Sequence, residues 1–107
     1  MKKLLLIVDN WELLERYEER FMSTYKILCA PLGPEGVRIA QEEIPEAILL
    51  NLTFENMTNE EGCAALEADP RTRLIPIAIV GEGGPGPYLW LKSPVTLASL
   101  EKLFSGQ

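Results

Sequence analysis

The chain has 107 residues, of which 47% are hydrophobic, with a formal net charge of −6, no histidine and two cysteines. This size suffices for one hydrophobic core, so we expect a single domain over residues 1–107. The acidic excess and the lack of a Lys and Arg cluster exclude nucleic acid as an expected partner, and two cysteines in apolar stretches exclude a disulfide framework or a zinc site.

Short runs rich in Leu, Ile and Val alternate along the chain with segments of helical period, which predicts an alternating β/α chain. The runs show no polar alternation, as is typical of parallel strands that are buried on both faces. Helices must then cover both faces of the sheet. The predicted strands are Lys3 to Asp9, Tyr25 to Ala30, Ala47 to Asn51, Ile75 to Val80 and Tyr88 to Lys92.

Four segments have helical periodicity. The second is predicted to begin at Pro34, the third follows the capping-box pattern Thr58-x-x-Glu61, and the last begins near Val95. In chain order the predicted core residues are Leu14, Tyr17 and Phe21; Val37 and Ile39 or Ala40; Cys63 and Leu66; and Leu97, Leu100 and Leu103 or Phe104.

The connection between the last two predicted strands has no helix of its own. Its residues, Gly-Glu-Gly-Gly-Pro-Gly-Pro from Gly81 to Pro87, are unsuited to a helix because interior glycine and proline cost roughly 1 and 3 kcal/mol each. A loop of this length reaches about 23 Å when extended, whereas a return along a short strand needs about 17 Å. A parallel last strand is therefore feasible, and an antiparallel one stays open because parallel crossovers normally take a dozen residues or more.

Four pieces of the sequence, in the right order, resemble the receiver domains of two-component response regulators. They are Lys3-Leu-Leu-Leu-Ile-Val-Asp9-Asn10, Ile48-Leu-Leu-Asn51-Leu-Thr-Phe-Glu-Asn-Met57, Ala68-Asp-Pro-Arg-Thr-Arg-Leu-Ile-Pro-Ile77 and Trp90-Leu-Lys-Ser93-Pro94-Val95. The resemblance implies an α/β fold, a doubly wound parallel five-stranded sheet of order 2-1-3-4-5, flavodoxin-like or receiver-like. The fourth helix of that fold is missing here or replaced by the Gly/Pro loop.

The resemblance also implies a phosphorylation pocket, whose residues are altered in this chain. Asn51 takes the place of the phosphoacceptor aspartate, and its amide is neither anionic nor a competent nucleophile. Asp9 keeps the first position of the acidic pair, but Asn10 takes the second, which in the family binds the metal ion directly. Because Mg²⁺ is held mainly through carboxylates, we expect no Mg²⁺ and no other cofactor.

Two further pocket positions lack the family's side chain. Gly81 stands where a threonine or serine hydroxyl is usual, and Pro94 aligned with the family's proline places Ser93 at the lysine position. Lys92 is one residue away and would point to the other face unless a bulge restores it, so Ser93 and Lys92 remain alternative equivalents.

Simpler structural roles also account for several of these residues. Asn10 is an N-cap by type and Asn51 a turn residue by type, so neither requires a ligand. Asp9 suits a structural carboxylate near a helix N-terminus. Trp90 aligns with the aromatic residue that changes rotamer in activated receivers, but without a phosphoryl trigger an ordinary packing role explains it better.

We therefore expect a cytoplasmic, phosphorylation-independent pseudo-receiver that acts in signalling or complex assembly by binding a protein partner or a second copy of itself. The longest apolar run, Leu4 to Val8, is too short for a membrane span. The expected interface is Gly81 to Trp90, with Tyr88, Trp90 and Pro94 as its candidate residues. The alternative is a small-ligand sensor that uses the crevice at the carboxyl ends of the strands. We expect no enzyme, since the catalytic groups are absent.

Overall fold

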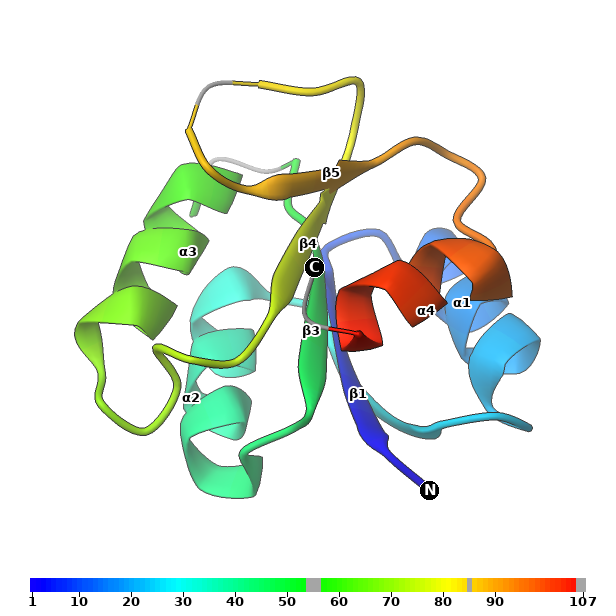
Figure 1. Cartoon of the computed structure of the whole chain (residues 1–107), viewed down its shortest axis with the longest axis horizontal. Helices are drawn as coiled ribbons and strands as arrows, with labels where there is room; N and C mark the ends of the chain where they lie inside the picture. The colour runs from blue at the N-terminus through cyan, green and yellow to red at the C-terminus, as the bar shows by residue number, and fades with distance from the viewer. Residues whose placement is uncertain (54–56, 85, 106–107) are drawn as a thin grey trace.

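A computed structural model of the chain describes residues 1–53, 57–84 and 86–105. Strands and helices alternate up to β4, as the sequence predicts (Figure 1). The elements are β1 (Lys3–Val8), α1 (Trp11–Phe21), β2 (Lys26–Ala30), α2 (Gly33–Glu43), β3 (Ala47–Asn51), α3 (Asn59–Ala68), β4 (Ile77–Val80), β5 (Leu89–Leu91) and α4 (Leu97–Phe104). All the predicted strands are present, and four of the five are shorter than predicted by one or two residues at an end.

The five strands form one parallel sheet of order β2-β1-β3-β4-β5, which confirms the predicted topology. The last strand is parallel to β4, with Ala78 opposite Leu89 and Val80 opposite Leu91. This settles the direction that the sequence left open. The short connection is sufficient because β5 has only three residues and pairs with the final part of β4.

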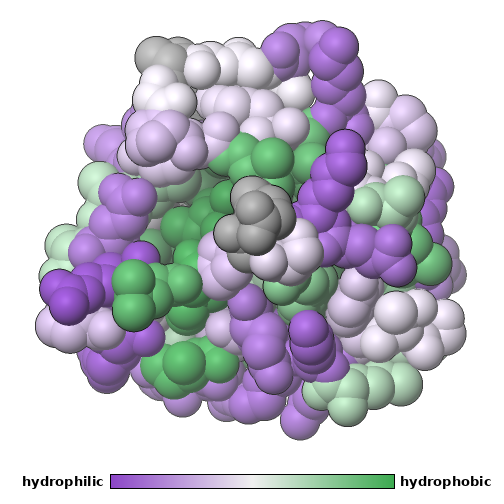
Figure 2. Space-filling model, in the orientation of Figure 1, coloured by the Kyte–Doolittle hydropathy of each residue, from purple (hydrophilic) through white to green (hydrophobic). Residues whose placement is uncertain are grey.

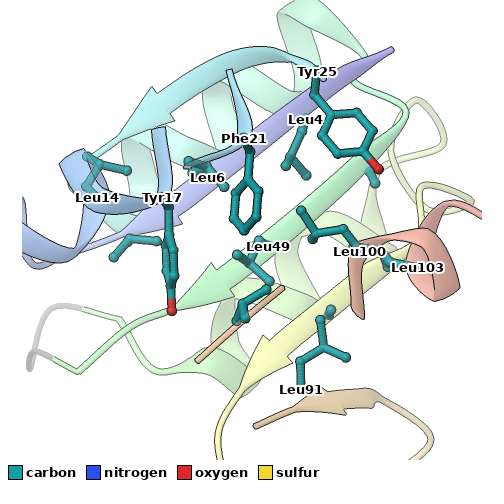
Figure 3. Packing of buried hydrophobic residues seen from close by; sticks show 14 residues of the cluster. Leu4, Leu6, Leu14, Tyr17, Phe21, Tyr25, Leu49, Leu91, Leu100 and Leu103 are labelled. Carbon is teal, nitrogen blue, oxygen red and sulfur yellow. The ribbon is translucent and has the colours of Figure 1, made fainter. Parts of the chain in front are cut away.

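The hydrophobic core lies on both faces of this sheet. One cluster joins β1, β3, α1 and α4 through residues that include Leu6, Phe21, Leu49 and Leu100 (Figure 3). The other joins the opposite face of the sheet to α2 and α3. Residues Leu4 to Val8 of β1 are all fully buried and contribute alternately to the two clusters. The unbroken apolar run of β1 therefore reflects burial on both faces.

Polar side chains cap three of the four helices. The side chain of Asn10 accepts a hydrogen bond from the Leu13 N–H, which confirms its reading as an N-cap. Thr58 and Glu61 form the predicted capping box at the start of α3. Thr96 accepts from the Ser99 N–H, so α4 begins at Leu97, two residues later than predicted.

The core positions of α1 and α3 are confirmed, since Leu14, Tyr17, Phe21, Cys63 and Leu66 are all buried. The prediction for the last helix is wrong at one position: Leu97 is 41% exposed, because it lies at the first turn next to the cap. Leu100 and Leu103 are buried, whereas Phe104 is half-buried and stacks on Tyr25 with ring centroids 4.5 Å apart.

Helix α2 lies on the sheet through small residues. It begins at Gly33, one residue before Pro34, and its buried residues are Gly33, Gly36 and Ala40. Val37 and Ile39 are half-buried at the edge of the cluster. A Cβ added at Gly36 would lie 2.6 Å from Cγ1 and Cγ2 of Ile7, so only glycine allows the helix to approach β1 this closely.

No helix occurs between β4 and β5 among residues 81–84 and 86–88, the part of this connection that the structure describes. Pro85, which belongs to the predicted Gly/Pro loop, lies outside the described residues. The connection is thus a loop as predicted. Within the described part of the chain, no helix has both the length and the apolar character needed to cross a membrane.

Two glycines inside helices provide a matched test of the close packing of α2. Alanine in place of either glycine gains about 1 kcal/mol of helix propensity. At Gly62 of α3 the added Cβ would lie 3.4 Å from Leu50, an ordinary contact, so Gly62→Ala should raise the midpoint of urea unfolding. At Gly36 the overlap with buried Ile7 costs about 1–3 kcal/mol, so Gly36→Ala should lower it. A rise for both variants would show that α2 can move away from β1.

Candidate functional site

The residues singled out in the sequence meet at one edge of the sheet. Asp9 directly follows β1, Asn51 ends β3, Gly81 directly follows β4, and Lys92 follows β5. The backbone N–H of Asp9 donates to the Asn51 carbonyl oxygen at 3.3 Å, and the N–H of Gly81 donates to the Leu91 carbonyl oxygen at 2.9 Å. The carboxyl ends of parallel strands thus gather these positions where open α/β sheets usually bind ligands.

The carboxylate of Asp9 is held by the loop that follows β3. Oδ2 accepts the backbone N–H of Thr53 and Oδ1 accepts the Thr53 hydroxyl, both at 2.8 Å. Asp9 is only 5% exposed, so these bonds replace water that the carboxylate has lost. Sequence reasoning missed Thr53. The sequence offered only a weak signal for this contact. Thr53 is a hydroxyl residue two positions after β3, a strand that neighbours β1.

The two asparagines differ in their surroundings. Asn10 is exposed and its side-chain oxygen is engaged as the cap of α1, 3.1 Å from the Leu13 nitrogen. Asn51 is half-buried and lies opposite Val8 in the ladder between β1 and β3. It is therefore the neutral amide of Asn51 that stands at the strand end next to Asp9.

No cationic side chain completes the pocket within the described residues. Lys92 and Ser93 are both exposed, and neither contacts Asp9 through an ion pair or hydrogen bond in that part of the chain. Because both side chains are exposed, burial does not distinguish between them. The choice between Lys92 and Ser93 as the family's lysine equivalent stays a prediction. Nor do the described residues contain a group of three His, Cys, Asp or Glu side chains placed to hold a metal ion.

Trp90 packs onto the glycines of the loop between β4 and β5. A Cβ added at Gly81 would lie 3.0 Å from Cζ3 of the indole, and one added at Gly84 only 2.6 Å from Cζ2. On its other side the ring joins the cluster shared with α2 and α3. The indole N–H is buried and has no hydrogen-bond partner among the residues that the structure describes. Gly81, which lacks the hydroxyl usual in receivers, thus makes room for the tryptophan ring.

The other predicted interface residues and the two cysteines are also placed. Tyr88 is half-buried and Pro94 is exposed. Burial, with a smaller contribution from Glu18, raises the pKa of the Cys29 thiol to about 11. Burial and the charges of Glu67 and Glu60 raise the pKa of Cys63 to about 11 as well. Both thiols are protonated at neutral pH, which makes them poor nucleophiles.

Among curated proteins the chain is similar to the response regulator PleD of Caulobacter vibrioides. The two are 30% identical over 82 residues, which cover 75% of this chain and 18% of PleD. The chain therefore matches less than a fifth of the length of this relative. No family model matches the sequence.

Solved structures of receiver domains resemble the whole chain. The chemotaxis protein CheY4 of Vibrio cholerae superposes with a TM-score of 0.84 at 22% identity, covering 98% of this chain and 97% of CheY4. The receiver domain of the sensor histidine kinase PA1611 from Pseudomonas aeruginosa, which has a magnesium ion in its active-site cleft, gives 0.83 at 20% identity, covering 97% and 94%. The receiver domain of a histidine kinase from Syntrophus aciditrophicus gives 0.83 at 21%, covering 99% and 92%. The fold is that of receiver domains.

The bond between Thr53 and Asp9 can be tested by a double-mutant cycle. Thr53→Val removes the hydroxyl that donates to the buried carboxylate, so the free energy of unfolding should fall by about 1–3 kcal/mol. Thr53→Ser retains the hydroxyl and should lose much less. In an Asp9→Asn background the effect of Thr53→Val should shrink, because the charged acceptor is gone. Equal losses in both backgrounds, measured by urea unfolding, would mean that this bond does not stabilise the fold.

The contact between Trp90 and Gly84 can be followed by fluorescence. In a Trp11→Phe background Trp90 is the sole tryptophan. Gly84→Ala should displace the indole from the loop, shift its emission to longer wavelength and increase quenching by acrylamide. Glu82→Ala, at an exposed position of the same loop, should leave both signals unchanged. Unchanged signals for Gly84→Ala would place the ring elsewhere in solution.

Proposed function

We propose that this chain, which has the fold of a response regulator receiver domain, works in two-component-type signalling without being phosphorylated, through contacts with other proteins. The similarity to the response regulator PleD and to receiver domains of histidine kinases supports a role in two-component-type signalling. The observation that carries the proposal is the pairing of Asp9 with the neutral Asn51 at the carboxyl edge of the sheet.

Asn51 supports the loss of phosphoryl acceptance on chemical grounds. An acyl phosphate forms when a carboxylate oxygen attacks phosphorus, and the nitrogen lone pair of an amide is delocalised into its carbonyl group. The residue stands at the end of β3 opposite Val8 of β1, which supports its alignment with the family's nucleophile. Without a carboxylate at position 51, no acyl phosphate can form at that position.

The residues of the pocket do not fit the magnesium ion that receivers of this fold use. Both oxygens of Asp9 already accept hydrogen bonds from Thr53, and the oxygen of Asn10 caps α1. Asp9 is then the one carboxylate that the aligned positions retain, whereas Mg²⁺ dehydrates reluctantly and is usually bound through carboxylates. A single engaged carboxylate supports little affinity for the ion.

A domain that is not phosphorylated cannot be switched by a phosphoryl group. It would act by binding a partner protein through its surface. The surface that departs most from other receivers lies over β4 and β5, where a loop replaces a helix among the described residues. We propose that this surface includes the interface predicted between Gly81 and Trp90. Part of it is covered internally, because Trp90 packs on Gly81 and Gly84. The part that stays open includes Tyr88 and the start of β4.

Incubation with Mg²⁺ and a small-molecule phosphodonor tests the loss of phosphorylation. Intact-mass spectrometry should show no phosphoryl adduct on the native chain, since Asn51 cannot form an acyl phosphate. The emission of Trp90, measured in the Trp11→Phe background, should not change either.

The matched variant restores the two missing carboxylates, Asn10→Asp together with Asn51→Asp. It should gain Mg²⁺ affinity, detectable as thermal stabilisation by the ion. A phosphoryl adduct on the native chain, whether acid-stable or an acyl phosphate, would show that another residue accepts the group and would overturn the proposal.

A further inference from the structure

A groove of about 350 Å³ opens on the outer edge of the sheet, beside the start of β4. Glu67 of α3 borders one side and Leu103 of α4 the other, while residues 73–77 and 87–89 complete its lining. Figure 2 shows hydrophobic residues gathered here, below β5 and between α3 and α4. This groove lies at the opposite end of the strands from the Asp9 pocket.

The groove exists because β5 is too short to cover β4. Pairing between the two strands begins at Ala78 and Leu89, so residues 75–77 enter the sheet without a partner from β5 in that ladder. In a doubly wound fold the crossover helix would cover such a region. The described part of the connection has no helix, so the side chains of Ile75, Ile77 and Tyr88 are only half-buried.

The floor of the groove suits side chains better than an added strand. Pro76 has no N–H, and its carbonyl oxygen already accepts from the Ile48 N–H at 3.0 Å. The N–H of Ile75 donates to the Thr72 carbonyl oxygen. A β-strand would find few free backbone groups there. Leu74, which is 88% exposed at the rim, extends the apolar surface outward.

The lining of the groove holds one acidic side chain, Glu67, and one basic side chain, Arg73, on a chain whose net charge is −6. Partial burial raises the pKa of Tyr88, and the negative charge of Glu67 raises it further, with a smaller effect from Glu60. Neither glutamate is in an ion pair within the part of the chain that is described. With a net charge of −6 on each copy, self-association through this face is opposed.

We propose that the groove binds an amphipathic helix of a partner protein, with an apolar stripe inserted between α3 and α4 and Lys or Arg side chains next to Glu67. The partner helix takes the place of the crossover helix that this chain lacks. Helices bind in this way through apolar residues at i, i+3 or i+4 and i+7. The inference rests on the proposed role in protein binding and names the chemistry of the partner.

The test uses a synthetic helical peptide of about 20 residues with a leucine stripe flanked by lysines. One comparison peptide has glutamate in place of each lysine, and another has serine in place of each leucine. Titration of the full chain at low salt should show binding of the first peptide alone, weakened by added salt. Binding of the glutamate peptide with equal affinity, or no binding of the lysine peptide, would overturn the proposal.

Matched variants locate the site. Leu74→Ser and Glu67→Gln should each weaken binding about tenfold, because each removes one of the two kinds of contact that the partner helix makes. Met22→Ser, which alters another exposed apolar side chain at the end of α1, and Glu15→Gln on α1 should have no effect. All four positions are exposed, so the variants should keep the circular dichroism of the native chain.

Two results would contradict the assignment of the groove. Unchanged affinity in Leu74→Ser and Glu67→Gln would place the peptide elsewhere. A concentration-dependent dimer of the native chain that Leu74→Ser abolishes would make the groove a contact between two copies. The phosphodonor experiment concerns the opposite end of the strands, so either proposal can fail without the other.

Discussion

Burial of β1 on both faces is the constraint from which the rest of the structure follows. Its residues Leu4 to Val8 have no exposed surface, and β2 and β3 pair with its two edges. A strand in this position needs helices above and below it, and parallel neighbours need crossovers that return to the same end of the sheet. The carboxyl end of β1 therefore places Asp9 at an edge where the ends of β3 and β4 also arrive.

The outer edge of the sheet is covered less completely than β1. This difference in burial explains why the Asp9 pocket is closely packed whereas the groove is open. Near β1 the helix α2 approaches so closely that Gly36 lies against Ile7. At β5 there is no comparable cover within the described residues, and the indole of Trp90 fills the upper part of the space by lying on Gly81 and Gly84. The lower part, next to Ile77, stays open as the groove.

The features that the sequence predicted are those set by neighbours along the chain. Uninterrupted apolar runs located the strands, and Asn10 and Thr58 marked helix starts because a cap bonds to an N–H three residues later. The features it did not predict depend on contacts between distant segments. Thr53 reaches Asp9 across 44 positions of sequence, and the need for glycine at position 36 arises from Ile7. The direction of β5 was open because loop reach alone allowed both.

The survival of Asp9 beside Asn51 has a physical explanation that involves no phosphoryl chemistry. A carboxylate that is 5% exposed is costly to bury unless donors surround it, and Thr53 supplies both an N–H and a hydroxyl at 2.8 Å. These bonds tie the end of β1 to the start of the loop after β3, next to the backbone bond from Asp9 to Asn51. Replacement of Asp9 would leave the Thr53 donors without that acceptor. Replacement of an aspartate at position 51, by contrast, would remove a second negative charge from next to Asp9 and relieve repulsion that a bound cation would otherwise offset. A neutral side chain at position 51 and a carboxylate at position 9 that Thr53 binds are thus both compatible with a stable fold in the absence of a cation.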